Sequence, residues 1–239
     1  MYVGLLGGTF NPVHSGHVRL AIEVKELALP DVRCPGAGRH GQVDRVDLIP
    51  CASPAHKAHD DMLPFPLRVA MARAAVGGVE GVFVNPLEGE RAGPSYTYDT
   101  LMAYHERSPE DRLLFVLGDE AFRALPTWHR GFELPRQCDM LVIPRAGMDA
   151  QQFSDVVREF WPGAACAAEP QGCRADVAAT TAWGGRVFWR PLPRLDISSS
   201  VLRQRWLDGD DLTCLVPEAA LGILREHRDT VTACWRQRR

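Results

Sequence analysis

Two histidines and three glycines lie within one short stretch near the start of the chain. Residues 7–17 read GGTFNPVHSGH, and the apolar run 2–6 precedes them. Apolar residues recur at helical spacing afterwards, so the pattern predicts a buried strand, a turn and a helix in that order. A helix N-terminus carries unpaired backbone N–H donors and the positive end of the helix dipole, which favour a phosphate. Because His14 and His17 add imidazoles at that point, we expect phosphate chemistry there.

A second stretch with related chemistry lies near the end of the chain, where residues 195–203 read LDISSSVLR. Ser198 or Ser199 is predicted to cap a helix, which would present hydroxyls and backbone donors to an anion. Arg203 follows one turn later and can direct its guanidinium at the same group. A serine cap followed by an arginine is ordinary by itself. Together with the two histidines, it predicts a second helix end that binds phosphate.

The spacing in residues 7–17 differs from both the dinucleotide fingerprint and the P-loop. It resembles the T/H-x-G-H signature of the nucleotidylyltransferase superfamily, and the whole string is similar to that of the bacterial nicotinate-nucleotide adenylyltransferases. The resemblance covers nearly the full chain except two expected insertions, near residues 30–44 and 162–185. It implies an α/β fold, a Rossmann-like doubly wound parallel sheet of the nucleotidylyltransferase type, in a single domain over residues 1–239.

The resemblance also implies an ATP site in which His14, His17 and Arg203 are catalytic. Members of the family have the sequence Gly-x-Asp after a central strand, and the carboxylate of its aspartate holds the adenosine ribose. Here Glu120 stands at the aspartate position beside Asp119, so either acid could serve. The implied ATP-binding positions are Gly7, Gly8, Thr9, Phe10, His14, His17, Gly118, Asp119, Glu120, Ile197, Ser198, Ser199, Ser200 and Arg203.

Three further segments resemble those with which the family holds nicotinate mononucleotide. Residues 95–97 and 126–128 match the family's Ser-Tyr-Thr and Pro-Thr-Trp. In the family, the Tyr-Thr part lies against the nicotinate ring and backbone donors meet its carboxylate, and an indole such as that of Trp128 can stack on the ring. Residues 54–57 match its Pro-Pro-His-Lys, with alanine for the second proline. By pattern alone, a Ser or Thr near residue 97 is a helix N-cap, the tryptophan is core and the lysine is solvated surface. The implied nicotinate-nucleotide positions are Lys57, Tyr96, Thr97, Trp128 and His129.

Strands and helices are predicted to alternate along the chain, which is typical of an α/β sheet whose ligand loops lie at the carboxyl edge. Residues 162–185 show weak pattern and are expected to be mostly irregular, and the basic end of the chain is expected to be solvated. An apolar stripe in the helix 67–75 is most simply core. Its members are Leu67, Ala70, Met71 and Ala74.

Composition excludes several classes of function. The chain has 239 residues, of which 46% are hydrophobic, so it can bury a sizeable core. A net charge of -3 argues against nucleic-acid and membrane partners. Seven cysteines without an ordered framework, and no leader pattern, predict a reduced cytoplasmic protein. We expect no metal held by protein ligands, and Mg²⁺ carried mainly by ATP. Oligomeric state stays open, a homo-oligomer included.

The resemblance implies adenylyl transfer from ATP to nicotinate mononucleotide, giving deamido-NAD and pyrophosphate. One alternative is the same chemistry on nicotinamide mononucleotide or phosphopantetheine. Another is a nucleotide sensor that keeps the pocket without turnover. The segments 95–97 and 126–128 favour a nicotinate ring, and the presence of both histidines and Arg203 argues against a sensor.

Overall fold

The computed structural model describes residues 1–29, 41–55, 61–145, 147–168 and 177–236. Within it the chain divides into two compact units that it visits alternately, and each is described below by itself. The prediction of a single domain stays a prediction. The first unit comprises Met1–Leu6, Glu23–Val46 and Tyr96–Pro193, and the second comprises Gly7–Ile22, Asp47–Ser95 and Arg194–Arg239.

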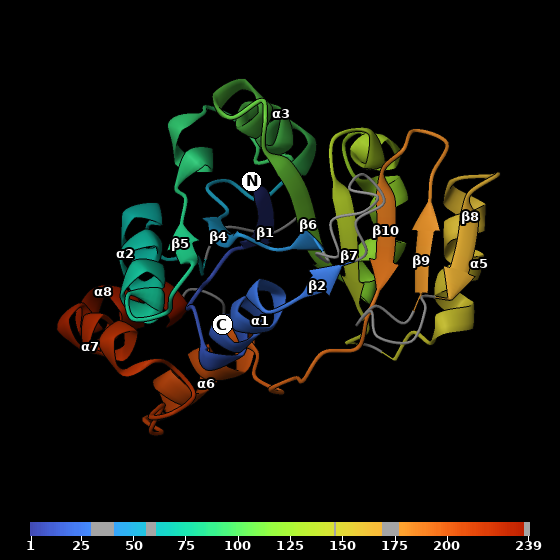
Figure 1. The fold of residues 1–239 in the computed structure, drawn as a ribbon. Coiled ribbons are helices and arrows are strands. Elements are labelled where there is room, and N and C mark those ends of the chain that lie inside the picture. Colours follow the sequence, from blue (N-terminus) through green and yellow to red (C-terminus); the bar gives the residue numbers. More distant parts are fainter. Residues whose placement is uncertain (30–40, 56–60, 146, 169–176, 237–239) are drawn as a thin grey trace. The chain divides into compact units, whose positions relative to one another are not determined.

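The described strands form one eight-stranded sheet and one two-stranded sheet (Figure 1). The hydrogen-bonding order of the larger sheet is β5-β4-β1-β6-β7-β10-β9-β8. The smaller sheet pairs β2 with β3 in antiparallel register. The strands are β1 Tyr2–Gly8, β2 Ala28–Leu29, β3 Gly41–Gln42, β4 Arg45–Pro50, β5 Val82–Val84, β6 Arg112–Gly118, β7 Asp139–Ile143, β8 Ala165–Ala168, β9 Val177–Thr180 and β10 Arg186–Trp189.

Helices and strands are interspersed along the described chain, and the central strands pair in parallel, so the predicted α/β class is confirmed. None of the helices that the structure describes is both long and apolar enough to cross a membrane. The α-helices are α1 Ser15–Lys25, α2 Phe65–Val76, α3 Thr97–Arg107, α4 Asp119–Arg123, α5 Ala150–Phe160, α6 Ser199–Asp208, α7 Glu218–Glu226 and α8 Arg228–Arg236. The 3₁₀ helices are η1 Leu87–Glu90, η2 Leu125–Thr127 and η3 Gly131–Arg136.

The first unit is built on parallel pairing of strands that are buried along almost their whole length. β1 pairs in parallel with β6, β6 with β7, and β7 with β10. A continuous apolar run is typical of such strands, because both faces of a central parallel strand are covered. At the start of β7, the buried Asp139 accepts a hydrogen bond from the hydroxyl of Tyr2 and pairs with Arg112.

Three expectations for the first unit differ from the structure. Residues 162–185 contain the antiparallel strands β8 and β9, which extend the sheet beyond β10. Residues 41–44 belong to β3 and its continuation, where Val43 is fully buried and Asp44 pairs with the backbone of Tyr2. The N-cap of α3 is Tyr96 rather than a serine or threonine.

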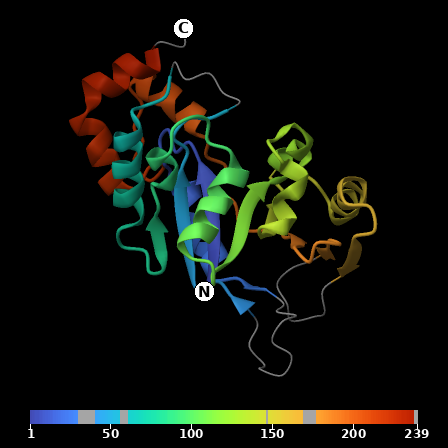
Figure 2. The ribbon, with the colours of Figure 1, turned by 90° about the horizontal axis from the view of Figure 1, so that it is seen from above.

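In the second unit, α2, α6, α7 and α8 group together (Figures 1 and 2). The predicted stripe on α2 is wrong in part, because Ala70 is exposed while Arg68 is fully buried. The basic end of the chain is not a solvated tail in its described part. It forms α8, whose Val231 and Trp235 are buried.

Candidate active site

The predicted strand is β1, and the predicted turn and the start of the predicted helix, α1, follow it in the second unit. The two imidazoles are stacked, with ring centroids 3.7 Å apart, and the ring of Phe10 meets His17 edge-on at 4.9 Å. His14 is buried and His17 half-buried. A Cβ added to Gly16 would lie 3.0 Å from Nδ1 of His14, which explains why glycine stands between the histidines. We call residues 9–14 the phosphate loop, after the ligand that the sequence predicts for them.

The hydrogen bond made by His17 orients its ring. Its Nδ1 lies 3.2 Å from the backbone N–H of His14. A nitrogen that accepts a hydrogen bond carries no proton, so the neutral ring holds its proton on Nε2. Nε2–H could therefore donate a hydrogen bond to a phosphate oxygen.

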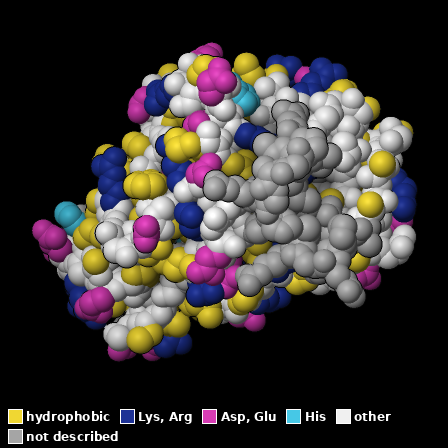
Figure 3. Space-filling model, viewed as in Figure 1, with side chains coloured by type: hydrophobic (Ala, Val, Ile, Leu, Met, Phe, Trp, Pro, Cys, Tyr) yellow, Lys and Arg dark blue, Asp and Glu magenta, His cyan; other side chains and the backbone are white. Residues whose placement is uncertain are grey.

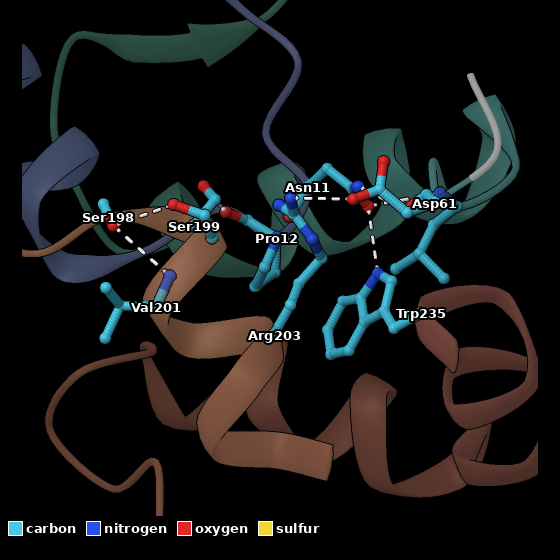
Figure 4. Close-up of polar contacts among 10 residues, drawn as sticks. Asn11, Pro12, Asp61, Ser198, Ser199, Val201, Arg203 and Trp235 are labelled. Carbon is cyan, nitrogen blue, oxygen red and sulfur yellow. Dashed lines mark hydrogen bonds and ion pairs between the residues drawn. The ribbon is translucent and has the colours of Figure 1, made fainter. Parts of the chain in front are cut away.

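The second phosphate signature lies against the phosphate loop (Figure 4). Ser198 is the N-cap of α6, and its hydroxyl accepts from the N–H of Val201. The hydroxyl of Ser199 donates to the carbonyl of Pro12 at 2.9 Å. Arg203 donates to the carbonyl of Asn11 at 2.9 Å through Nη1. The two sequence signatures, 187 residues apart at the Ser199–Pro12 contact, are thus joined within one unit.

Arg203 also forms an ion pair with Asp61, at 2.9 Å between Nη2 and Oδ2. Its guanidinium is mostly buried and lies beside the backbone of the phosphate loop. The remaining predicted positions of this segment, Ile197 and Ser200, are half-buried and exposed respectively. Lys57 lies outside the described residues.

The other predicted nicotinate-binding residues, Tyr96, Thr97, Trp128 and His129, belong to the first unit. The rings of Tyr96 and His129 lie 4.6 Å apart and are tilted by 35°. Thr97 is the first residue of α3, and none of the described side chains caps that helix N-terminus, so its first N–H groups can receive a carboxylate. Trp128 is half-buried and meets Phe115 of β6 edge-on at 6.3 Å. An aromatic surface next to backbone donors suits a pyridine carboxylate.

The structure separates the two adjacent acids that follow β6 and Gly118. Asp119 is buried, and its carboxylate accepts hydrogen bonds from the backbone N–H groups of Arg145, Met148 and Glu120 at 3.0, 3.1 and 3.2 Å. Asp119 therefore fixes the loop after β7. Glu120 is exposed to solvent. Of the two carboxylates, that of Glu120 is the one open to solvent.

Sequence reasoning missed Arg68, whose side chain is fully buried in the second unit. Its Nη1 donates to the carbonyls of Thr9 and Cys51, both at 2.7 Å, and its Nε donates to Leu63 at 2.9 Å. Burial lowers the pKa of the Arg68 guanidinium, while the nearby Cys51 and Glu88 act in the opposite direction. An arginine in a helix ordinarily indicates a solvated face, so no sequence signal separates this one from the rest.

The described residues include no group of three or more His, Cys, Asp or Glu side chains that could hold a metal ion. On the face shown in Figure 3, described charges of both signs are interspersed. Such a distribution accords with the small net charge of -3.

Comparisons with known proteins agree on one family. The cytidylyltransferase-like family model matches residues 5–205. A probable nicotinate-nucleotide adenylyltransferase from Pelobacter propionicus is 33% identical over 235 residues, covering 95% of this chain and 97% of that protein. Another, from Pseudomonas syringae pv. tomato, is 35% identical over 226 residues, with 94% and 91% covered.

Solved structures show the same fold at lower identity. One is Plasmodium falciparum nicotinic acid mononucleotide adenylyltransferase complexed with NaAD, with a TM-score of 0.65, 16% identity and coverage of 95% of this chain and 96% of that one. The same protein complexed with APC gives a TM-score of 0.66 at 15% identity, with 96% of each chain covered. Likeness at such identity concerns the fold alone.

Proposed function

The chain belongs to the cytidylyltransferase-like family and within it to the nicotinate-nucleotide adenylyltransferases, and we propose on that premise that it transfers the adenylyl group of ATP to nicotinate mononucleotide. The products are deamido-NAD and pyrophosphate, which places the reaction in NAD biosynthesis. The observation that carries this proposal is the contact of α6 with the phosphate loop, through Ser199 and Arg203.

The reaction needs positioning and charge stabilisation rather than a general base. A phosphate oxygen of nicotinate mononucleotide forms a bond to the α-phosphorus of ATP. The bond from that phosphorus to the bridging oxygen of the β-phosphate breaks, and pyrophosphate leaves with the electron pair. Because the nucleophile is already an anion, no proton has to be removed. Catalysis of phosphoryl-type transfer rests on holding the groups in line and on stabilising the charge that spreads over their oxygens.

We assign the phosphates of ATP to residues of the second unit. His17 would donate from Nε2, because its Nδ1 is occupied by the backbone of His14. The N-terminus of α6 would supply hydroxyls and backbone donors, and Arg203 would supply a permanent positive charge beside the loop. Gly7 and Gly8, which have no side chain, would let the phosphates approach the backbone, and Thr9 follows them at the start of the loop.

We assign the pyridine ring and the ribose to residues of the first unit. Tyr96, Trp128 and His129 would provide the aromatic surface, and the first turn of α3, which begins at Thr97, would receive the carboxylate. Glu120 would accept from the adenosine ribose hydroxyls, because the carboxylate of Asp119 is already engaged by backbone donors.

Magnesium enters this proposal as part of the substrate. The described residues offer no carboxylate cluster for it, so Mg²⁺ would arrive as the complex with ATP. We also place the reaction in the cytoplasm, a proposal supported by five described cysteines that are free thiols.

The proposal is tested by pyrophosphate release from MgATP with nicotinate mononucleotide, its amide and phosphopantetheine as parallel acceptors. We expect strong preference for the acid, because the N-terminus of α3 favours a carboxylate. Equal use of acid and amide would remove the roles given to Tyr96, Thr97 and Trp128. Release with none of the three would contradict the proposed function.

A further inference from the structure

The side chain and backbone of Asn11 connect four segments of the second unit. Its side chain is buried, and Nδ2 donates to the carbonyl of Asp61 at 2.8 Å. Its Oδ1 accepts from the backbone N–H of Leu63 at 3.1 Å and from the indole N–H of Trp235 at 3.4 Å. Its own carbonyl accepts from Arg203. Figure 4 shows these contacts converging from the phosphate loop, the segment before α2, and helices α6 and α8.

The backbone conformation of Phe10, the residue before Asn11, explains why the loop must be held by these hydrogen bonds. Phe10 is buried and has a φ of 46°, in the left-handed region that favours glycine. A side chain held in that region costs about 1–3 kcal/mol and persists only where its surroundings over-determine it. The ring of Phe10 meets His17 edge-on. The position of Phe10 therefore limits where the ring of His17 can lie.

The side chains of Asn11 and Arg68, which together we call the clamp, hold the phosphate loop from both sides. Leu63 donates its N–H to Asn11 and accepts from Nε of Arg68 at its carbonyl. Arg68 in turn bonds the carbonyl of Thr9. Two buried side chains thus hold the loop against the same short segment, on either side of Phe10.

Helix α8 reaches this clamp through Trp235. Its indole is buried, and it packs edge-on against Trp206 of α6 at 5.9 Å between centroids. The indole N–H is directed at Asn11, while that of Trp206 bonds the hydroxyl of Thr232 at 3.0 Å. Each tryptophan therefore donates one indole hydrogen bond to a side-chain oxygen. Trp235 donates to the phosphate loop, whereas Trp206 donates to α8.

We propose that Asn11 is the positioning residue of the phosphate loop and that Trp235 acts with it, which makes α8 part of the ATP site. This inference rests on the proposed function, since it assigns the loop to ATP phosphates. It predicts that a change at the end of the chain alters the use of ATP and leaves the use of the acceptor unchanged.

The test compares Trp235→Phe with Trp206→Phe as the matched control. Each variant keeps an aromatic ring and loses one indole hydrogen bond. We expect Trp235→Phe to lower kcat/KM for ATP about threefold to tenfold, the effect of one lost neutral hydrogen bond. The KM for nicotinate mononucleotide should stay unchanged, and Trp206→Phe should stay within twofold of the unaltered chain. Equal effects of the two variants on ATP would overturn the proposal.

A second variant and a binding measurement separate this inference from the proposed function. Asn11→Ala should lower kcat/KM for ATP more than Trp235→Phe, and a folded Asn11→Ala protein with normal use of ATP would overturn the proposal. Should the unaltered chain form no deamido-NAD, the proposed function fails. Calorimetric binding of a non-hydrolysable ATP analogue then still decides the inference, because Trp235→Phe should weaken it and Trp206→Phe should not.

Discussion

At the scale of single residues, the candidate site depends on how closely its side chains are packed. The rings of His14 and His17 stack with their centroids 3.7 Å apart, and the backbone N–H of His14 donates a hydrogen bond to Nδ1 of His17. Gly16 leaves no spare room beside His14. Ring orientation is therefore set by contacts within a few residues of the chain, which is what catalysis by positioning requires.

Gly16→Ala tests this packing. The new Cβ would lie 3.0 Å from Nδ1 and 3.1 Å from Cε1 of His14, so the stacked ring would have to shift. We expect turnover to fall roughly tenfold, about 1.4 kcal/mol of activation free energy, with little change in melting temperature. Gly222→Ala in α7 is the control, because a Cβ there meets nothing within 4 Å. Unchanged turnover in Gly16→Ala would show that the packing is irrelevant.

The neighbouring acids Asp119 and Glu120 should separate into a structural and a ligand-binding residue. Asp119→Asn places an amide N–H₂ where backbone N–H groups now find acceptors, so the free energy of unfolding should fall by about 1–3 kcal/mol. Glu120→Gln keeps the shape but loses the charge, so the KM for ATP should rise about fivefold at unchanged stability. Chemical denaturation and steady-state kinetics measure both, and the reverse pattern would exchange the assignments.

At the scale of elements, the site depends on α6 reaching the phosphate loop. Ser199→Ala removes the hydroxyl that donates to Pro12 at 2.9 Å. We expect kcat/KM for ATP to fall about threefold to tenfold. Ser154→Ala in α5 removes an equivalent hydroxyl-to-carbonyl bond of 2.9 Å, to Ala150. If both variants use ATP equally well, the contact of α6 with the loop has no catalytic importance.

The sequence predicts those elements whose local pattern and burial agree. β6 contains a continuous apolar run, β4 is apolar except at Arg45 and Asp47, and a serine at position 198 is a favourable N-cap for α6, so all three were predictable. β8 and β9 were not, because short alanine-rich strands lack an alternating pattern. In α8, two buried apolar residues at i and i+4 stand among charged neighbours, and the basic composition concealed them.

At the scale of the whole molecule, buried and half-buried ionisable groups should limit stability in alkali. Burial, followed by the charge of Glu88, raises the pKa of the Cys51 thiol from 9.0 to about 11. Burial also raises the pKa values of Cys138 and of Tyr2. A group whose pKa is higher in the folded state stabilises the fold fully below its unfolded pKa, and this contribution is lost as pH rises through the folded value.

We therefore expect the free energy of unfolding to fall between pH 9 and pH 11, the window set by Cys51. Cys51→Ala removes that thiol, so the free energy of unfolding of the variant should fall less steeply over the same pH interval. Urea unfolding at a series of pH values measures the slopes. An identical slope in Cys51→Ala would contradict a half-buried thiol that stays protonated up to about pH 11 at this position.

Fold class and family could be predicted from the sequence because eleven consecutive residues at a strand end carry the signature. The clamp around that signature could not be. Arg68 and Trp235 are far from the phosphate loop in sequence and belong to residue types that usually indicate surface or core. Their hydrogen bonds to Thr9 and Asn11 depend on tertiary packing that no local pattern contains.

The measurement that tests the central claim most directly is formation of deamido-NAD from MgATP and nicotinate mononucleotide, followed by chromatography, for the unaltered chain and His17→Ala. The unaltered chain should form deamido-NAD and pyrophosphate in equal amounts. His17→Ala should lose roughly 100-fold or more of the rate at an unchanged melting temperature. Absence of product from the unaltered chain, or full activity in a folded His17→Ala protein, would contradict the account.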